Sequence, residues 1–378
     1  MKNINRIILP TCLKRALVLA WLASASTIAS GLAQPRYSLT DLGVLPGYAS
    51  SIANHINDNG DVVGYCAPAI ENFNDMGFIW HKGVMNSIGR LPKGHYSEAL
   101  GVNSLGQGVG MGDAGNFQPQ AILSRNGLLI NIDPASGNIQ GLSINDGGVI
   151  SGNYHIGGSA NNAGWRPAIW TEDGRKPGHF NRLLLAIPTG GTPDLANGFA
   201  TAANKSNQLV GYIDAFPLFG QHAAFWNNDA AHTLVDLGTL PGDGSSIAWG
   251  INDFGQVAGE SHPAFGSLPV IWSSDPAHTA IPLPLLPGEN YGAATAVNNL
   301  GQALGHSAVS VPGTWNVGPS RIVIWRDGGV FELQSVLDPA TAAGWTITSA
   351  NGINNLGQIA AVGTHNGISR AIVLAPMQ

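Results

Sequence analysis

The sequence predicts an all-β fold: a seven-bladed β-propeller of four-stranded antiparallel blades. Three observations predict it. A segment that contains a strand, a tight turn and a second strand recurs seven times along the chain. Small residues recur on the first strand of every copy, as expected where blades converge on an axis. The last copy has three strands only, and a matching fourth strand stands near the start of the chain.

The recurring turn is Asn, two variable residues and usually Gly, between two apolar runs. Asn suits the first position of a type I turn, and Gly suits the left-handed position that closes it, so the pattern indicates a hairpin. In the fourth copy Asn207 replaces the Gly, and Asn tolerates positive φ better than most residues. The seven marker residues are Asn57, Asn103, Asn145, Asn204, Asn252, Asn298 and Asn354.

Two small positions precede each marker Asn. They lie four and two residues before it, and the period of two of a strand predicts that both point to one face. Because small side chains let backbones approach, we expect this strand to be the innermost of its blade. The first set is Ala53, Ala99, Gly141, Ala200, Ala248, Ala294 and Ala350, and the second is His55, Gly101, Ser143, Ala202, Gly250, Ala296 and Gly352.

The third and fourth strands complete each repeat. The third is an apolar run that often ends in Trp, and we expect this set to pack between blades: Trp80, Trp170, Trp226, Trp272 and Trp325. The fourth is clearest at 84–89 and 233–238, and Leu-Pro-Gly connectors follow at 45–47, 240–242 and 286–288. Four short strands at regular spacing are typical of a propeller blade.

The fourth strand of the last blade is expected at residues 37–43, where YSLTDLG matches the fourth-strand sequence TLVDLG. Pairing this strand with the C-terminal strands closes the ring and removes two open sheet edges. The rival architectures are an open stack of hairpins and a β-helix. Such solenoids need atypical polar caps, and none is visible in the sequence.

The N-terminus predicts export. Basic residues precede the apolar run 16–25, and small residues follow it, so residues 1–33 read as a signal peptide and 34–378 as a single propeller domain. A transmembrane anchor is the alternative, but the run is far shorter than the ~20 residues of a membrane span. We therefore expect no membrane span and a location in the periplasm or outside the cell.

Charge and cysteine content narrow the partners. The chain has 17 basic and 23 acidic residues, and cleavage removes four basic ones, which leaves a net charge of −10. This sign argues against nucleic acid or an anionic membrane as partner. Cys12 lies in the discarded segment, so no intramolecular disulfide can form. Cys66 is interpreted as a buried structural thiol, with a reactive thiol as the alternative, and we expect a monomer.

Three segments resemble a known family. TDLGVLPG (40–47), VDLGTLPG (235–242) and GINDFGQVAG (250–259) are similar to the repeats of the HAF family of bacterial extracellular repeat proteins. The resemblance covers essentially the whole mature chain. Residues 131–138 and 185–194 depart from it, because other sequences replace the connector there. The resemblance implies an exported repeat protein and supplies no catalytic residue.

A blade of this kind has two different faces. The turns within the first hairpin and between strands three and four form one, here called the turn face. The connectors between blades and the loops between strands two and three form the other, here called the loop face. Its loops vary widely, which is typical of binding surfaces. The same face gathers His155, Trp165 and Trp315. The candidate ligand-binding residues there are Tyr48, Tyr65, His95, Tyr96, Tyr212, Asp243, Glu260, His262, Glu289, Tyr291, His306 and Trp345.

The sequence contains no recognisable catalytic or metal motif. Residues 57–61 resemble a calcium loop, but the other six copies lack the carboxylates and a hairpin turn explains all seven. No His-Glu-x-x-His, paired-Cys or Gly-x-Ser-x-Gly pattern occurs, so we nominate no catalytic residue, metal or cofactor. The sequence predicts an exported, non-catalytic module that binds a glycan or a protein. The alternatives are a secreted polysaccharide-acting hydrolase or lyase with a site at the propeller centre, and a structural surface protein.

Overall fold

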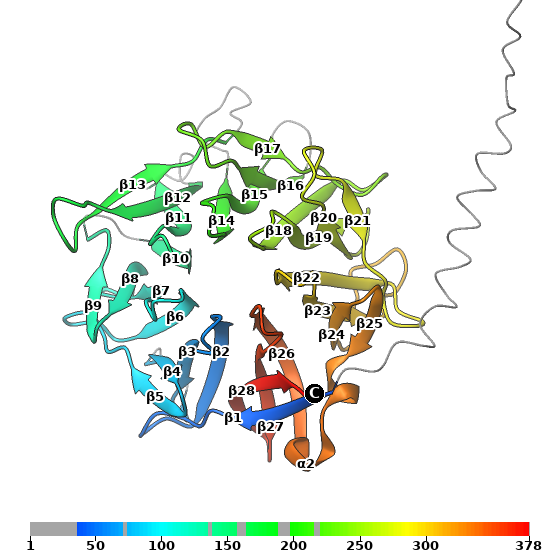
Figure 1. Cartoon of the computed structure of the whole chain (residues 1–378), viewed down its shortest axis with the longest axis horizontal. Coiled ribbons are helices and arrows are strands. Elements are labelled where there is room, and N and C mark those ends of the chain that lie inside the picture. Colours follow the sequence, from blue (N-terminus) through cyan, green and yellow to red (C-terminus); the bar gives the residue numbers. More distant parts are fainter. Residues whose placement is uncertain are drawn as a thin grey trace, which may run out of the picture.

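A computed structural model describes residues 36–70, 74–134, 138–156, 164–187, 197–214 and 220–377. The predicted signal peptide lies outside these residues. Seven four-stranded antiparallel sheets stand around a central axis, as Figure 1 shows. The prediction of a seven-bladed propeller is therefore confirmed.

Each of the first six blades runs outward from the axis in chain order. Blades 1 to 3 are β2 (Ser50–Ile56), β3 (Val62–Ala67), β4 (Met76–His81) and β5 (Val84–Ser87); β6 (Ser97–Val102), β7 (Gly108–Gly112), β8 (Gln120–Arg125) and β9 (Leu128–Asn131); and β10 (Ile139–Ile144), β11 (Ile150–Ile156), β12 (Gly164–Glu172) and β13 (Phe180–Leu184). Blades 4 to 6 are β14 (Gly198–Ala203), β15 (Leu209–Asp214), β16 (Gln221–Trp226) and β17 (Leu234–Asp236); β18 (Ser245–Ile251), β19 (Val257–His262), β20 (Leu268–Trp272) and β21 (Ala280–Pro282); and β22 (Tyr291–Val297), β23 (Ala303–Ala308), β24 (Arg321–Arg326) and β25 (Gly329–Glu332).

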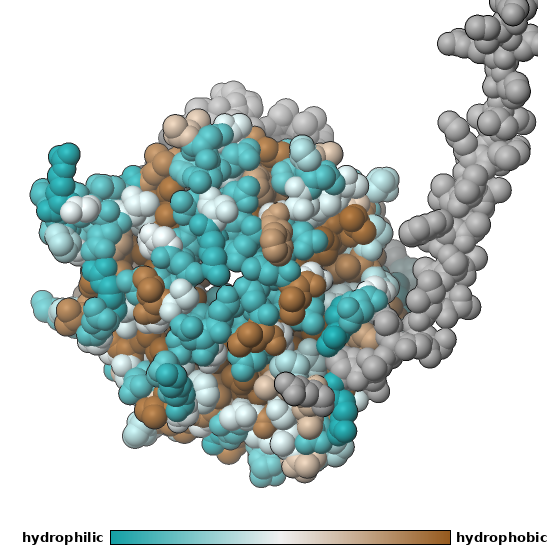
Figure 2. All heavy atoms as spheres, viewed as in Figure 1, coloured by the Kyte–Doolittle hydropathy of each residue, from teal (hydrophilic) through white to brown (hydrophobic). Residues whose placement is uncertain are grey.

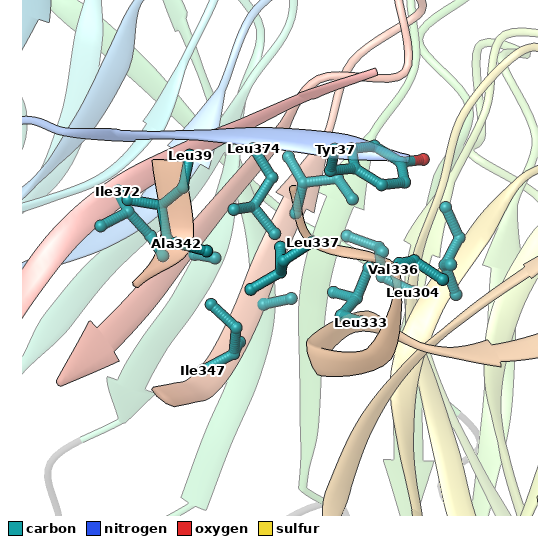
Figure 3. Packing of buried hydrophobic residues seen from close by; sticks show 14 residues of the cluster. Tyr37, Leu39, Leu304, Leu333, Val336, Leu337, Ala342, Ile347, Ile372 and Leu374 are labelled. Carbon is teal, nitrogen blue, oxygen red and sulfur yellow. The ribbon is translucent and has the colours of Figure 1, made fainter. Parts of the chain in front are cut away.

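The seventh blade joins the two ends of the described chain. Its order is β1-β28-β27-β26, from β1 (Tyr37–Asp41), β28 (Ile368–Pro376), β27 (Ile359–His365) and β26 (Trp345–Ile353). β1 lies antiparallel to β28, with Tyr37 opposite Pro376. Tyr37 and Leu39 pack with Leu374 and with the short helices η2 (Leu333–Val336) and α2 (Pro339–Ala342), as Figure 3 shows. The predicted closure by the N-terminal strand is confirmed.

Every marker Asn begins a hairpin turn, and the turn needs a left-handed residue at its end. Gly60, for example, has φ +82°, and Asn207 adopts φ +56° at the same position of the fourth copy. The amide of the turn residue donates back to the marker Asn carbonyl, as from Asn207 to Asn204 at 3.1 Å. The repeat alignment and its one exception therefore match the structure.

The two small positions of the innermost strand do not share a face. In every blade a β-bulge separates them, for instance where Ala53 opposes Gly64 but His55 opposes Val63. Gly141 faces the preceding blade, where the Gly110 carbonyl lies 3.5 Å from a built Cβ, whereas Gly250 faces the following blade, 3.2 Å from Ala296 Cα. The period-of-two prediction was wrong because the extra residue reverses the alternation. Both positions are small because each meets a different neighbour.

The marker side chains link all seven blades in a closed ring of hydrogen bonds. Each Nδ2 donates to the backbone carbonyl of the next marker Asn, from Asn57 to Asn103 at 2.7 Å and finally from Asn354 back to Asn57 at 2.9 Å. Each Oδ1 accepts backbone N–H groups of its own turn, as from Phe254 and Gln256 to Asn252. All seven are buried. The marker Asn therefore sets both the turn and the contact to the next blade.

Apolar clusters fill the spaces between blades. Trp170 of blade 3 packs with Val109 and Leu123 of blade 2, and Trp272 of blade 5 packs with Phe225 of blade 4. Trp170, Trp226, Trp272 and Trp325 are buried, which confirms the predicted packing role of these four rings. Trp80 is half-buried.

Cys66 is buried beside Met85, with the Leu45 amide 3.4 Å from its Sγ. Burial raises the pKa of this thiol, which matches the structural interpretation. In the part of the chain that the structure describes, no helix is long and apolar enough to cross a membrane.

Replacing Asn252 with Ala should destabilise the fold by about 4 kcal/mol, because four hydrogen bonds of about 1 kcal/mol net are lost in a buried setting. Urea unfolding measures the change. Asn316→Ala, at an exposed loop position, is the control and should stay within about 0.5 kcal/mol of the parent. Equal stability of the Asn252→Ala variant would contradict the role assigned to the ring.

Replacing Leu39 with Ala should cost about 2 to 4 kcal/mol, because Leu39 is 7% exposed within the closing cluster. In and beside β1, the backbone amides of Leu39 and Leu42 donate to Thr341 Oγ1 and to the Ala371 carbonyl, each at 3.0 Å, and should exchange slowly with solvent. Rapid exchange of this strand in an otherwise protected molecule would show that the ring is not closed by β1.

Candidate functional site

The loop face carries the twelve candidate residues at the ends of inner strands and in the connectors. The structure divides them into three sets. One set gathers around Glu260 between blades 5 and 6 and includes Tyr212, which reaches it through Trp249. A second set gathers around Glu98 between blades 1 and 2. The remaining four, Tyr48, Asp243, Glu289 and Trp345, are each engaged in local contacts.

Glu260 is the centre of the first set. It lies on β19, and its carboxylate accepts hydrogen bonds from Trp249 Nε1 at 2.9 Å and Ser267 Oγ at 2.5 Å. His262 Nε2 lies 3.1 Å from the same carboxylate. Burial tends to raise the pKa of Glu260, but the donors around it, His262 first, lower it below its ordinary value. The group is therefore a fixed negative charge on the loop face.

Tyr291 and His306 of blade 6 complete this set. Their rings lie 5.9 Å apart, and burial, followed by the charge of Glu260, raises the pKa of the Tyr291 hydroxyl. Burial lowers the pKa of His306 despite the opposing effect of Glu260. Carboxylate, imidazole and phenol groups from two blades thus share one region.

An aromatic arc leads to this region from blades 3 and 4. It consists of His155, Trp165, Phe199, Tyr212 and Trp249, with consecutive ring centroids 5.0, 5.7, 4.9 and 6.1 Å apart. All five side chains are half-buried, so each ring shows part of its surface to solvent. Trp249 joins the arc to Glu260 through its indole N–H. The result is a stacking surface that ends at a carboxylate.

The second set surrounds Glu98 on β6. Burial, and then the charge of Asp75, raise the pKa of Glu98 to about 7. Glu98 in turn raises the pKa of Tyr65 and of Tyr96, in both cases after the larger effect of burial. His95 stacks on Phe117 at 3.9 Å. A half-buried carboxyl group of this kind titrates in the neutral range.

Four candidates are held in structural contacts. Tyr48 accepts a hydrogen bond from Arg90, Asp243 accepts one from Ser261, and Glu289, whose side chain is 5% exposed, pairs with Arg321. Trp345 stacks on His365 at 4.9 Å in blade 7. The structure does not bring these four together.

The axis holds two cavities. The one toward the loop face is about 250 Å³ and is lined by His55, Trp249 and the bulged residues of the inner strands. His55 Nδ1 is buried there without a hydrogen-bond partner among the described residues, and burial lowers the pKa of His55 to about 4. The imidazole is therefore neutral at physiological pH.

The cavity toward the turn face is about 160 Å³, and Lys205 stands at its mouth. Its Nζ lies 3.5, 3.7 and 3.6 Å from the carboxylates of Asp58, Asp146 and Asp253. Figures 1 and 2 view the molecule from this face, and Figure 2 shows a polar centre with separate hydrophobic side chains around it. A protein cation therefore already occupies the acidic centre of the turn face.

The residues at 57–61, which resembled a calcium loop, make internal contacts. Asp61 accepts a hydrogen bond from Asn57 Nδ2 at 2.9 Å and pairs with His81. Across the described ranges, no three His, Cys, Asp or Glu side chains are grouped so as to hold a metal ion.

Three site residues were missed in the sequence, although the repeat alignment carries a signal for each. Trp249 occupies the bulge position, where other copies have Asn, Leu or Thr. Glu98 occupies the position of Ile52 and Ile247 in other blades and is the one charged residue there. Phe199 stands at the same strand position in blade 4. Each is an exception to its column of the repeat.

The raised pKa of Glu98 predicts a pH-dependent stability difference between the parent protein and Glu98→Gln. Below the unfolded value near 4.5 the carboxyl is protonated in both states, so its favourable contribution is fully present. That contribution is lost as the pH rises from 4.5 to about 7, because the carboxyl ionises in the unfolded state while burial keeps it protonated in the folded state. Glu98→Gln should therefore gain stability relative to the parent between pH 4.5 and 7, measured by urea unfolding. A difference that does not change with pH would contradict the assignment.

No protein-family model matches the chain, and no curated protein matches it. The fold is similar to the β-propeller domain of the Trilobed protease from Pyrococcus furiosus, with 8% identity, a TM-score of 0.54, and coverage of 89% of this chain and 96% of that one. It is also similar to the uncomplexed acylaminoacyl peptidase from Pyrococcus horikoshii, with 11% identity, a TM-score of 0.50, and coverage of 88% of this chain and 53% of that one.

The chain therefore spans about half the length of that peptidase. A weaker likeness is to TolB from Acinetobacter baumannii, with 10% identity, a TM-score of 0.43, and coverage of 85% of this chain and 65% of that one. At these identities the likenesses show the fold alone. The chain is a β-propeller module.

Proposed function

We propose that this chain is an exported, non-catalytic module that binds a glycan along the aromatic arc of its loop face. The observation that carries the proposal is the arc itself, five half-buried rings in sequence across blades 3 to 5. The HAF-like repeats and the signal-peptide pattern of residues 1–33 support export to the periplasm or the cell exterior.

A glycan suits this surface better than a globular protein does. Pyranose rings have apolar C–H faces and polar rims, so they stack on aromatic side chains while their hydroxyls reach polar neighbours. The arc offers rings in a row, and Glu260 and His262 stand at its end as hydrogen-bonding groups. We infer a chain of several sugar units rather than a single sugar, because the rings extend over three blades.

The rigid support of the arc favours binding. Phe199 and Tyr212 lie opposite one another on paired strands β14 and β15, and Trp249 is fixed through its hydrogen bond to Glu260. A preformed surface loses little conformational entropy when a ligand binds. The module therefore needs no rearrangement to present the arc.

The polysaccharide-acting enzyme remains the alternative, with a site at the propeller centre. Glycoside hydrolysis uses a pair of carboxylates beside the scissile bond. The loop-side axial cavity is lined by one imidazole, that of His55, and by no carboxylate among the described residues. This lining gives the alternative no support at that position.

Glycan binding should be lost when the arc is cut. The mature protein, residues 34–378, is screened on a glycan array, and the best glycan is then titrated by calorimetry. Tyr212→Ala should weaken binding at least about tenfold, equal to about 1.4 kcal/mol, because the ring that joins Phe199 to Trp249 in the arc is removed. Circular dichroism checks that the variant folds.

Trp345→Ala is the matched control, since Trp345 is a half-buried aromatic residue of blade 7 outside the arc. It should bind as the parent does. Failure to retain any glycan while a protein ligand is captured, or equal loss in both variants, would overturn the proposal. Shortening of the glycan during incubation would favour the enzyme.

A further inference from the structure

A pocket of about 530 Å³ opens between blades 1, 2 and 3 on the loop face. It shares no lining residue with the aromatic arc. Tyr96, Met111, Phe117 and Pro119 form its apolar walls, and the carboxyl groups of Asp75 and Glu98 and the amide of Gln140 supply its polar groups. Its volume suits a side chain or a small organic molecule.

Asp113 holds the walls of this pocket in place. Its buried carboxylate accepts hydrogen bonds from the backbone N–H groups of Tyr96 at 3.2 Å and Phe117 at 3.1 Å, and it pairs with His95 Nδ1 at 2.7 Å. These bonds tie the segment before β6 to the loop after β7. Phe117 adopts φ +57° there and stacks on His95. The pocket is therefore shaped before any ligand arrives.

The charge inside the pocket is negative. Asp75 and Glu98 contribute the two carboxyl groups of the lining. No Lys, Arg or His is among the described residues that line it. Burial and Asp75 both disfavour the charged form of Glu98, and the described residues that line the pocket include no cationic side chain to offset these two effects. The site thus has a carboxyl group that a positive ligand would stabilise.

We propose that this pocket binds an organic cation, an ammonium or guanidinium group carried on an apolar stem. The stem would pack against Met111, Phe117 and Tyr96, and the charged head would pair with Glu98. Aromatic walls add to this preference, because a cation is attracted to the face of an aromatic ring. An inorganic cation would leave the apolar walls unused, and a neutral apolar ligand would leave Glu98 unpaired.

The cation can come from two sources, a lysine or arginine side chain of a polypeptide or a free organic amine. Both present the same head and stem. Binding should release part of a proton near pH 7, because the cation favours the ionised form of Glu98, which is partly protonated there. Proton release distinguishes this site from glycan binding on the arc, which involves no titrating group of this kind.

The test is calorimetry at pH 7 on the mature protein in two buffers of different ionisation enthalpy. The probes are phenethylamine, Nα-acetyl-lysine amide and Nα-acetyl-arginine amide, with 2-phenylethanol and Nα-acetyl-norleucine amide as neutral counterparts. Each cation should bind at least about tenfold more tightly than its neutral counterpart. Tighter binding of the blocked amino acids would indicate a polypeptide, and tighter binding of phenethylamine a free amine.

Glu98→Gln should weaken cation binding about tenfold and remove the proton release, whereas Glu332→Gln, a half-buried carboxylate on β25, should leave both unchanged. Phe117→Ala removes an exposed wall residue and should weaken binding without affecting folding. Equal affinity for cations and neutral counterparts in the parent protein would overturn the proposal whether or not a variant folds. Loss of glycan binding in Tyr212→Ala with cation binding intact would show that the two sites are separate.

Discussion

The closed ring of asparagine hydrogen bonds is the constraint on which the rest of the structure depends. One side chain per repeat caps its own hairpin turn through Oδ1 and reaches the next blade through Nδ2. Because these groups are buried, each must be paired, and the pairing fixes the distance and angle between neighbouring blades. Seven equivalent links then define the axis, and the end of the chain meets its beginning when Asn354 reaches Asn57.

Two further features follow from this ring. The bulge before each marker Asn turns one small residue toward the preceding blade and the next toward the following blade, so inner strands can approach on both sides. At the outer edge of the seventh sheet, β1 pairs with β28. Because β1 leads directly into the first blade, this pairing joins the last blade to the first. The hydrogen bonds at the polar centre and the apolar packing between blades thus both hold the blades in the ring.

The uniform turn face leaves the loop face free to vary. The hairpins on the turn face are bound by the same few contacts in each copy, and Lys205 fills the acidic centre they create. Strand positions that other blades fill with aliphatic, hydroxyl or amide residues carry Trp249, Phe199 and Glu98 near the loop face. The aromatic arc and the pocket between blades 1, 2 and 3 both contain such exceptions on a common framework.

The residue pattern was sufficient to predict the number of blades, the turns and the pairing of the chain ends, because each depends on local backbone chemistry repeated at a fixed spacing. Asn207 at positive φ and residues 37–41 beside β28 were both predictable for that reason. It also placed Glu260, His262, Tyr291 and His306 on one face. The pattern could not predict which side chains of the loop face meet, because residues from different blades become neighbours only when the blades pack together. Tyr212 meets Trp249 and Glu98 faces Asp75 across blade boundaries, whereas Glu289 is taken up by Arg321.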